Sequence, residues 1–166
     1  MQKTGQFLFE TELKWLQDSK GMLTSRSIMD PIKVATPKSF RGIEGGMWSP
    51  EHLLIGAVSS CFMTTFLFYA KQKGLPVTNF ECEAIGLVEL KSGRLKFTEI
   101  NVYPKVIVEK EFLTDLAKEA IELTKQNCLI TSVLSVIVYY HPTIELGEHL
   151  PENKQQLKGE KREFFF

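Results

Sequence analysis

Residues 49–74 read SPEHLLIGAVSSCFMTTFLFYAKQKG, and no charged residue occurs between Leu53 and Ala70. Cys61 lies at the middle of this apolar interval. A helix that is apolar on almost every side belongs in a large core, in a subunit interface or in a membrane. The interval is close to the minimum length of a membrane span and carries several small polar residues. We therefore expect a helix in a subunit interface, with a cysteine at its centre.

Signals at both ends of this segment predict where the helix begins and ends. Ser49 is a favoured N-cap residue, and Pro50 suits the first helical position because its missing N–H has no helical partner there. Glu51 then meets the positive end of the helix dipole. Gly74 suits the left-handed position that follows a helix, and a proline comes two residues later. The helix should begin at Pro50 and end just before Gly74.

The composition excludes several classes of protein. With 166 residues the chain is long enough for one domain with a single core. Its 20 Lys and Arg residues balance 20 Asp and Glu residues, so the basic surface of a nucleic-acid-binding protein is not expected. The N-terminal residues carry charges where a secretory signal needs an apolar run, and three cysteines do not suggest a disulfide scaffold. We expect a cytoplasmic protein with neither nucleic acid nor membrane as a partner.

The periodicity of the remaining sequence predicts an α+β fold. Alternating apolar and polar residues indicate strands, the first of them half-buried, and most neighbouring strands should pair antiparallel. The expected strands are 7–16, 22–28, 32–35, 77–90, 95–109 and 136–141, and the expected later helices are 111–126 and 128–134. The domain should cover residues 1–141, and residues 142–166 should form a polar C-terminal tail.

Several kinds of catalytic site have no signal in the sequence. The three cysteines and three histidines lack the short paired spacings of a zinc site. No G-x-S-x-G serine elbow occurs, and Gly42, Gly45 and Gly46 do not have the spacing of a phosphate-binding loop. We expect neither a metal ion nor another cofactor. Of the kinds of catalytic site considered, one based on a cysteine thiol is the one that remains.

The positions of the three cysteines predict different roles. Cys82 alternates with Phe80 and Ala84 on one face of an expected strand, and a free cysteine is usually a small buried apolar residue. Cys128 opens an expected helix, and a helix N-terminus lowers the pKa of a thiol. Cys61 lies too far inside its own helix for that effect. It therefore needs a cation from elsewhere to become a reactive thiolate.

Two motifs make the sequence resemble a known family. The run S-P-E-H-L-L-I-G-A-V-S-S-C-F places a glutamate ten residues before a cysteine, and C-L-I-T-S-V-L follows later with the pattern C-x-[IV]-[ST]-x-V-L. Together with a terminal apolar strand, this combination resembles the OsmC/Ohr family of bacterial thiol-dependent hydroperoxide reductases over roughly residues 7–141. The resemblance implies antiparallel sheets wrapped around a long central helix that carries the first cysteine. It also implies an intertwined homodimer of OsmC-like domains.

The resemblance further implies roles for particular residues. Cys61 would attack the peroxide, and Cys128 would convert the resulting sulfenic acid into a disulfide. Glu51 and an arginine would organise the site. In the OsmC-type branch, which the spacing favours, the arginine lies ten residues before the glutamate and corresponds to Arg41. In the Ohr-type branch it lies further upstream, where Arg26 is the candidate.

Helix geometry adds a prediction about assembly. The ten residues from Glu51 to Cys61 correspond to a rise of about 15 Å and a rotation of about 80° along a helix. The two side chains of one helix therefore cannot easily meet around one guanidinium. We expect Arg41 and Glu51 of one chain to reach Cys61 of a second chain in a two-fold homodimer.

The function implied by the resemblance is the reduction of organic hydroperoxides to alcohols, with hydrogen peroxide as a second candidate substrate. Met47, Trp48, Phe62 and Phe66 would line the substrate site, although each also suits a core. An external dithiol would reset the enzyme, and in the family this is a lipoylated protein. Two alternatives stay open: a non-catalytic protein that binds a hydrophobic small molecule in the dimer cleft, and a thiol redox sensor. Peroxide turnover distinguishes the enzyme from both.

Overall fold

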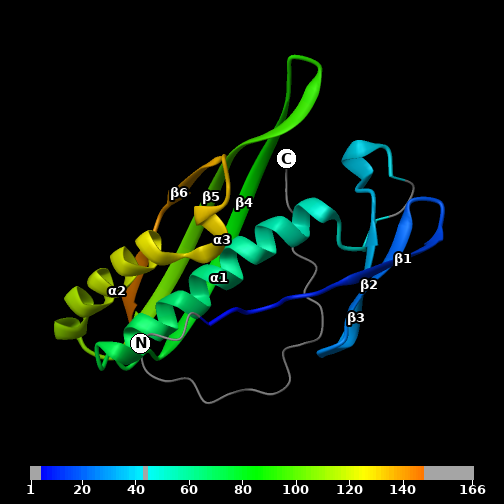
Figure 1. Ribbon diagram of the computed structural model, residues 1–166. Helices are drawn as coiled ribbons and strands as arrows, with labels where there is room; N and C mark the ends of the chain where they lie inside the picture. The colour runs from blue at the N-terminus through cyan, green and yellow to red at the C-terminus, as the bar shows by residue number, and fades with distance from the viewer. Residues whose placement is uncertain (1–4, 43–44, 148–166) are drawn as a thin grey trace. The chain divides into compact units, whose positions relative to one another are not determined.

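The computed structural model describes residues 5–42 and 45–147 (Figure 1). The chain divides after Ala57 into two compact units, each with its own sheet. The elements follow the order β1-β2-β3-η1-α1-β4-β5-η2-α2-α3-β6-β7. This arrangement confirms the α+β class predicted from the sequence.

The first unit contains a three-stranded antiparallel sheet in the order β1-β2-β3. Its strands are β1 (Glu12–Gln17), β2 (Lys20–Ser25) and β3 (Ile28–Ala35), followed by the short helix η1 (Lys38–Phe40). At the end of β3, the N–H of Ala35 donates to the carbonyl oxygen of Trp48 at 2.9 Å. This bond ties the sheet to the segment that leads into α1.

Strand β1 is shorter and more exposed than the sequence predicts. Residues 7–16 were expected to form a half-buried strand, but β1 covers Glu12–Gln17 and all six of its residues are exposed. Leu13 and Trp15 share a face and expose 63% and 76% of their surface. Alternation predicts which side chains share a face, but it does not say whether another element covers that face. Among residues 5–42 and 45–147, nothing covers the face of β1 that carries Leu13 and Trp15.

Helix α1 (Pro50–Gln72) ends as predicted. Gly74 adopts a φ of 66°, which costs a glycine little. The N–H of Leu75 donates to the carbonyl of Ala70 at 2.9 Å, and the N–H of Gly74 donates to that of Lys71 at 3.2 Å. These two bonds form a Schellman motif, which satisfies carbonyls that have no partner inside the helix.

The N-terminus of α1 is closed by a reciprocal pair of hydrogen bonds. The N–H of His52 donates to Oγ of Ser49 at 3.3 Å, and the N–H of Ser49 donates to Nδ1 of His52 at 3.3 Å. Ser49 is fully buried. The arrangement is a capping box in which histidine takes the place usually held by glutamate or glutamine. The predicted N-cap role of Ser49 is thereby confirmed.

The second unit contains a mixed sheet. Strands β4 (Asn79–Lys91) and β5 (Arg94–Val108) form a long antiparallel hairpin, and β6 (Ile137–Tyr140) pairs with β5 in parallel. The helices η2 (Glu111–Leu113), α2 (Thr114–Asn127) and α3 (Leu129–Ser132) connect β5 to β6. A parallel neighbour requires such a crossover, whereas an antiparallel neighbour can follow a short turn.

The sheet extends beyond the predicted end of the domain. The sequence suggests a polar tail from Pro142, but Thr143–Leu146 forms strand β7, which is parallel to β5. The N–H of Gly147 also donates to the carbonyl of Val108 at 3.1 Å. The segment is short and largely exposed, so its strand character comes from pairing with β5 and not from apolar periodicity. The remainder of the predicted tail, 148–166, lies outside the described residues.

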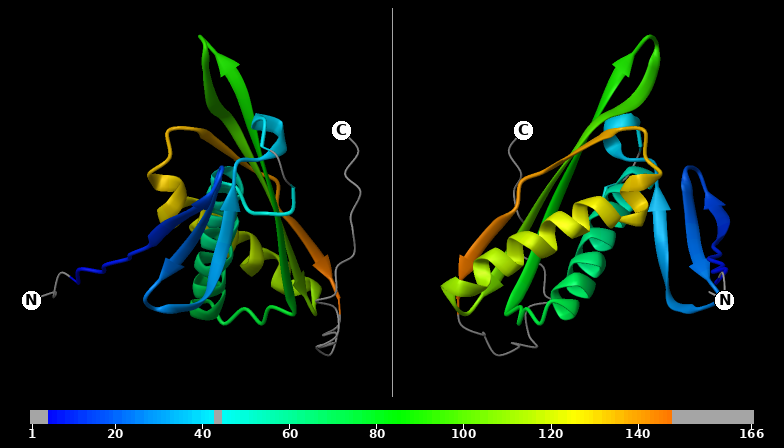
Figure 2. Two further views of the ribbon diagram at one scale, coloured as in Figure 1. Left: turned by 90° about the vertical axis from the view of Figure 1, so that its right-hand side faces the viewer. Right: turned by 60° about the vertical axis from the view of Figure 1, so that its left-hand side comes forward.

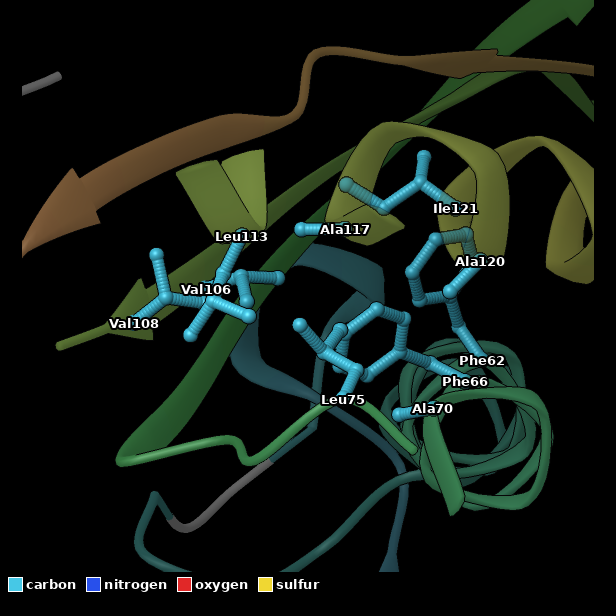
Figure 3. Close-up of a cluster of buried hydrophobic side chains, with 10 residues drawn as sticks. All are labelled: Phe62, Phe66, Ala70, Leu75, Val106, Val108, Leu113, Ala117, Ala120 and Ile121. Carbon is cyan, nitrogen blue, oxygen red and sulfur yellow. The ribbon is translucent and has the colours of Figure 1, made fainter. Parts of the chain in front are cut away.

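The core of the second unit lies between the sheet and two helices. Helix α2 and the C-terminal part of α1 cover the same face of the β4–β5 hairpin (Figure 2). Phe62 of α1 points toward Ala120 and Ile121 of α2, and Phe66 belongs to the same buried cluster (Figure 3). Val106 and Val108 of β5 belong to the same cluster. Burial of these rings anchors α1 and so holds Cys61 in place.

Several apolar side chains of α1 are exposed in the part of the chain that the structure describes. The most apolar window of the helix has a mean hydropathy of 1.8 but is only 22% buried, and by length and composition alone α1 could cross a membrane. Met63, Leu67 and Phe68 expose 37%, 40% and 56% of their surface. An apolar surface of this kind on a helix needs a covering partner.

Candidate functional site

Two of the predicted site residues lie side by side in the second unit. Cys61 lies on α1, and Cys128 lies between α2 and α3, where it ends one helix and begins the next. The side chains of Cys61 and Cys128 are joined by a hydrogen bond. Both thiols are free, Cys61 partly exposed and Cys128 buried. The structure therefore brings together the two cysteines that the sequence analysis paired.

The sulfur of Cys61 receives several hydrogen bonds. Partial burial raises the pKa of the Cys61 thiol, but these bonds outweigh burial, so that its pKa lies below the usual value. In decreasing order of effect, the partners are the N–H of Ile130, the Cys128 thiol, the Thr65 hydroxyl and the N–H of Leu129. The Oγ1 of Thr65, one helical turn away, lies 4.0 Å from the sulfur. Cys61 is therefore the thiol of the pair that ionises more readily.

The pKa of Cys128 shifts in the opposite direction from the one expected. Burial raises the pKa of this thiol, and its hydrogen bond to Cys61 raises it further, because Cys128 keeps its proton while Cys61 carries the charge. The N–H and the hydroxyl of Thr131 lower the pKa again by a smaller amount. The N-terminus of α3 was predicted to lower the pKa of Cys128. Its N–H groups at Leu129 and Ile130 instead lower the pKa of Cys61. Only the tertiary contact between α3 and α1 could have revealed this.

Two residues next to the thiol pair were not identified from the sequence. The hydroxyl of Thr131 donates to the carbonyl of Cys128 at 3.1 Å and also contacts its sulfur. Burial raises the pKa of Tyr140, on β6, and the nearby Thr131 side chain lowers that pKa by a smaller amount. A sequence signal existed for Thr131, which is the [ST] position of the second motif. No comparable signal existed for Tyr140.

Cys82 lies apart from this pair. It lies on β4, and burial raises the pKa of its thiol to about 11. Its sulfur lies 3.8 Å from the carbonyl oxygen of Glu83. These properties fit the structural role that the sequence analysis assigned to it.

Arg41 occupies a tight turn in the first unit. Its φ is 65°, a left-handed conformation that is uncommon for a residue other than glycine. A Cβ on the following Gly42 would lie 1.9 Å from the carbonyl oxygen of Thr36, so this turn requires glycine at position 42. The Arg41 side chain is exposed. Arg26, the alternative arginine, forms an exposed ion pair in which Nε lies 3.3 Å from Oε1 of Glu10.

The carboxylate of Glu51 is not fully hydrogen-bonded within the described residues. Its Oε2 atom is buried, and among residues 5–42 and 45–147 no group donates a hydrogen bond to it. A buried carboxylate oxygen without a donor is costly, so native structures normally provide one. The side chain is therefore arranged for a partner that the described part of one chain does not supply.

The four residues expected to line a substrate site fall into two groups. Phe62 and Phe66 are fully buried in the core cluster of the second unit, which is the alternative considered for them from the sequence. Met47 borders an open hollow of about 350 Å³ beside Leu16 and Lys33 in the first unit. Trp48 is 54% exposed, and its ring lies edge-on to that of His52 at 6.3 Å. Of the four, Met47 and Trp48 are accessible.

Metal ligands do not gather in the described part of the chain. No group of three or more His, Cys, Asp and Glu side chains there is arranged to hold an ion.

Comparison with known proteins identifies the family. The sequence model of a family described as OsmC-like protein matches residues 43–139, more than half of the chain. The chain belongs to the OsmC-like family. The matched region contains Glu51, Cys61 and Cys128, whereas both candidate arginines lie upstream of it.

Known proteins resemble this chain at low sequence identity, one by its sequence and others by their solved structures. The uncharacterised protein YmaD of Bacillus subtilis is 23% identical over 132 residues, which cover 76% of this chain and 86% of YmaD. A Vibrio cholerae OsmC-like protein of unknown function superposes with a TM-score of 0.72 at 18% identity, over 83% of this chain and 100% of the other. An organic hydroperoxide resistance protein from Elizabethkingia anophelis, crystallised with thiocyanate, superposes with a TM-score of 0.68 at 16% identity, over 87% and 100%. The family and fold of this OsmC-like chain are thus established.

Proposed function

We propose that this protein is a thiol-dependent peroxidase that reduces organic hydroperoxides to alcohols. The observation that carries the proposal is the contact between Cys61, whose pKa is lowered, and Cys128, a buried thiol that donates to it. A thiolate is the reactive form of cysteine, and a second thiol within contact can trap its oxidised product. Membership of a family that includes hydroperoxide resistance proteins supports this reading.

The proposed cycle has three balanced steps. The Cys61 thiolate attacks one peroxide oxygen, so that an S–O bond forms, the O–O bond breaks and the departing alkoxide takes up a proton as the alcohol. Cys128 then attacks the sulfenic acid sulfur, forming an S–S bond and releasing hydroxide, which leaves with the thiol proton as water. An external dithiol exchanges with the disulfide, becomes oxidised itself and restores both thiols. A lipoylated protein in the cytoplasm is the proposed reductant.

We further propose that the active site is composite, as expected from helix geometry. Helix α1 is continuous from Pro50 to Gln72, so Glu51 and Cys61 lie about 15 Å apart along it. Among the described residues, no group donates a hydrogen bond to the buried Oε2 of Glu51, and apolar side chains of α1 remain exposed. A homodimer that pairs two copies of α1 would bury the exposed apolar side chains of the helix. It would also let Glu51 bind a guanidinium that faces the thiolate of the partner chain.

Arg41 is the proposed source of that guanidinium, in the manner of the OsmC-type branch. Its left-handed backbone is the kind of local strain that proteins retain where a side chain must be held in one direction. Arg26 already has a carboxylate partner in Glu10. Met47 and Trp48 are proposed to contribute the apolar wall of the substrate site.

Peroxide consumption tests the proposed function. Cumene hydroperoxide and hydrogen peroxide would be supplied separately, with dihydrolipoamide as reductant. We expect turnover of the organic peroxide by the wild type and by Cys82→Ser, and none by Cys61→Ser. If the wild type forms the Cys61–Cys128 disulfide but does not turn over any peroxide, the peroxidase proposal is wrong, and a redox-sensor function becomes the better explanation.

A further inference from the structure

We propose that His52 positions the indole of Trp48, and that the positioned indole gives the substrate site a preference for hydroperoxides that carry an aromatic ring. This inference rests on the proposed function, in which Trp48 forms part of the apolar wall of that site. The contacts that carry it lie entirely within the first unit.

The backbone of Trp48 is fixed by strand β3. Trp48 forms an isolated parallel bridge with Val34, and its carbonyl oxygen accepts the N–H of Ala35 at 2.9 Å. Backbone pairing fixes where a side chain begins, but it leaves several staggered rotamers open. Because Trp48 is 54% exposed, burial alone does not select one of them. The direction of the indole therefore depends on the side chains that it contacts.

His52 provides one of these contacts and is itself held in one orientation. Its Nδ1 atom lies 2.8 Å from Oγ of the fully buried Ser49 and accepts the N–H of the same residue at 3.3 Å. An imidazole nitrogen that accepts a hydrogen bond carries no proton, so the ring proton of His52 is on Nε2. The capping box thus fixes the direction of the imidazole as well as the start of α1.

The imidazole contacts the indole edge-on. The two ring centroids are 6.3 Å apart and the ring planes lie at 89°, an arrangement that aromatic pairs favour. One helical turn further along α1, a Cβ added to Gly56 would lie 3.9 Å from Cζ3 of Trp48. Residues four apart share one face of a helix. The indole therefore lies along the face of α1 that carries His52 and Gly56, and the His52 ring restricts its rotation.

An indole with restricted rotation favours particular substrates. A side chain that is already immobilised loses little entropy when a ligand packs against it, whereas a mobile side chain must first be ordered. A phenyl group covers more of the indole than a tert-butyl group does, and two aromatic rings gain further from their preferred geometries. The preference should therefore be for aryl hydroperoxides such as cumene hydroperoxide over tert-butyl hydroperoxide.

The first test follows Trp48 by fluorescence and requires no turnover. Trp15→Phe leaves Trp48 as the single tryptophan of the chain. In this background, His52→Gln keeps an acceptor for the N–H of Ser49 but removes the ring, and His52→Ala removes both. We expect both variants to show lower anisotropy and faster quenching by acrylamide than the parent, although only the Ala variant loses the cap. Unchanged anisotropy and quenching in His52→Gln would overturn the inference.

The second test measures kinetics with both tryptophans present. His52→Gln should raise KM for cumene hydroperoxide by roughly two- to tenfold, the cost of ordering one side chain on binding, and should act on KM and not on kcat. KM for tert-butyl hydroperoxide should change less. Equal changes in the two KM values would overturn the preference for an aromatic ring. A wild type without turnover, in which His52→Gln still loosens Trp48, would contradict the proposed function and support the positioning of Trp48.

Discussion

The thiol of Cys128 donates a hydrogen bond to the sulfur of Cys61, and the pKa values of the two cysteines move in opposite directions. This single contact therefore helps to make Cys61 the more acidic thiol and Cys128 the less acidic one. Cys61 carries the charge and is the partly exposed member, while Cys128 keeps its proton and is buried. This difference fits the proposed cycle, in which the Cys61 thiolate reacts first and the protonated Cys128 thiol reacts second.

This hydrogen bond can be tested by titration. Thiolate is the form that reacts with iodoacetamide, so a lower pKa moves the midpoint of the rate profile to a lower pH. Cys128→Ala removes one donor from the Cys61 sulfur, and we therefore expect the midpoint to move to higher pH than in the parent. Alkylation rates would be measured against pH in a Cys82→Ala background. An unchanged or lower midpoint would show that Cys128 does not stabilise the thiolate.

The assignment of the active-site arginine predicts a clear difference between two variants. Arg41→Ala should lower kcat/KM for cumene hydroperoxide by roughly 100-fold, the usual effect of losing one charged group that stabilises a transition state. Arg26→Ala should have little effect, because its visible partner is the exposed Glu10. Thermal unfolding of both proteins provides the control for folding. The reverse pattern would favour the Ohr-type arrangement.

The composite site predicts that two inactive variants restore activity when mixed. Glu51→Ala supplies an intact Cys61, and Cys61→Ser supplies an intact Glu51, so a heterodimer contains one complete site. After unfolding and refolding together at equal concentrations, we expect about a quarter of wild-type activity, because half of the dimers are mixed and each has one working site of two. Activity that stays at the level of the separate variants would indicate that each site belongs to a single chain. Sedimentation equilibrium would first establish that the protein is a dimer.

The capping box at Ser49 predicts a specific pattern of stabilities. Ser49→Ala should lower the free energy of unfolding by about 1 kcal/mol, because the N–H of His52 loses its acceptor. His52→Gln should retain the cap, since glutamine also accepts from the N-cap N–H, whereas His52→Ala should lose it. Urea unfolding at a fixed protein concentration measures these differences. Equal stabilities of the Gln and Ala variants would show that the imidazole contributes no cap.

The two faces of α1 predict different consequences for two phenylalanines. Phe66→Ala should lower the free energy of unfolding by about 3–5 kcal/mol, because it leaves a cavity in the core. Phe68→Ala, at a position 56% exposed, should instead weaken self-association. Urea unfolding and sedimentation would be compared for both. If Phe66→Ala raised KM for cumene hydroperoxide at unchanged stability, Phe66 would belong to the substrate site after all.

Local rules account for the parts of the fold that the sequence predicted well. The ends of α1 follow from Ser49 and Gly74, whose side-chain chemistry and conformational freedom act within a few residues. The β4–β5 hairpin follows from periodicity and a short turn. Strand β7 was not predicted, because its few exposed residues owe their conformation to hydrogen bonds with β5, which is distant in the sequence.

The sequence by itself determined the family motifs and the long apolar helix, and it singled out Cys61 and Cys128 as the pair of thiols to which the proposed function assigns the chemistry. Only the tertiary structure decided what surrounds each sulfur. It directs the N–H groups of Leu129 and Ile130 to Cys61 and not to Cys128, and it places Tyr140 next to Thr131. The physical reason is that a sulfur atom's pKa depends on donors and burial within a few ångströms, and packing between α1, α3 and β6 brings those groups together from separate parts of the chain.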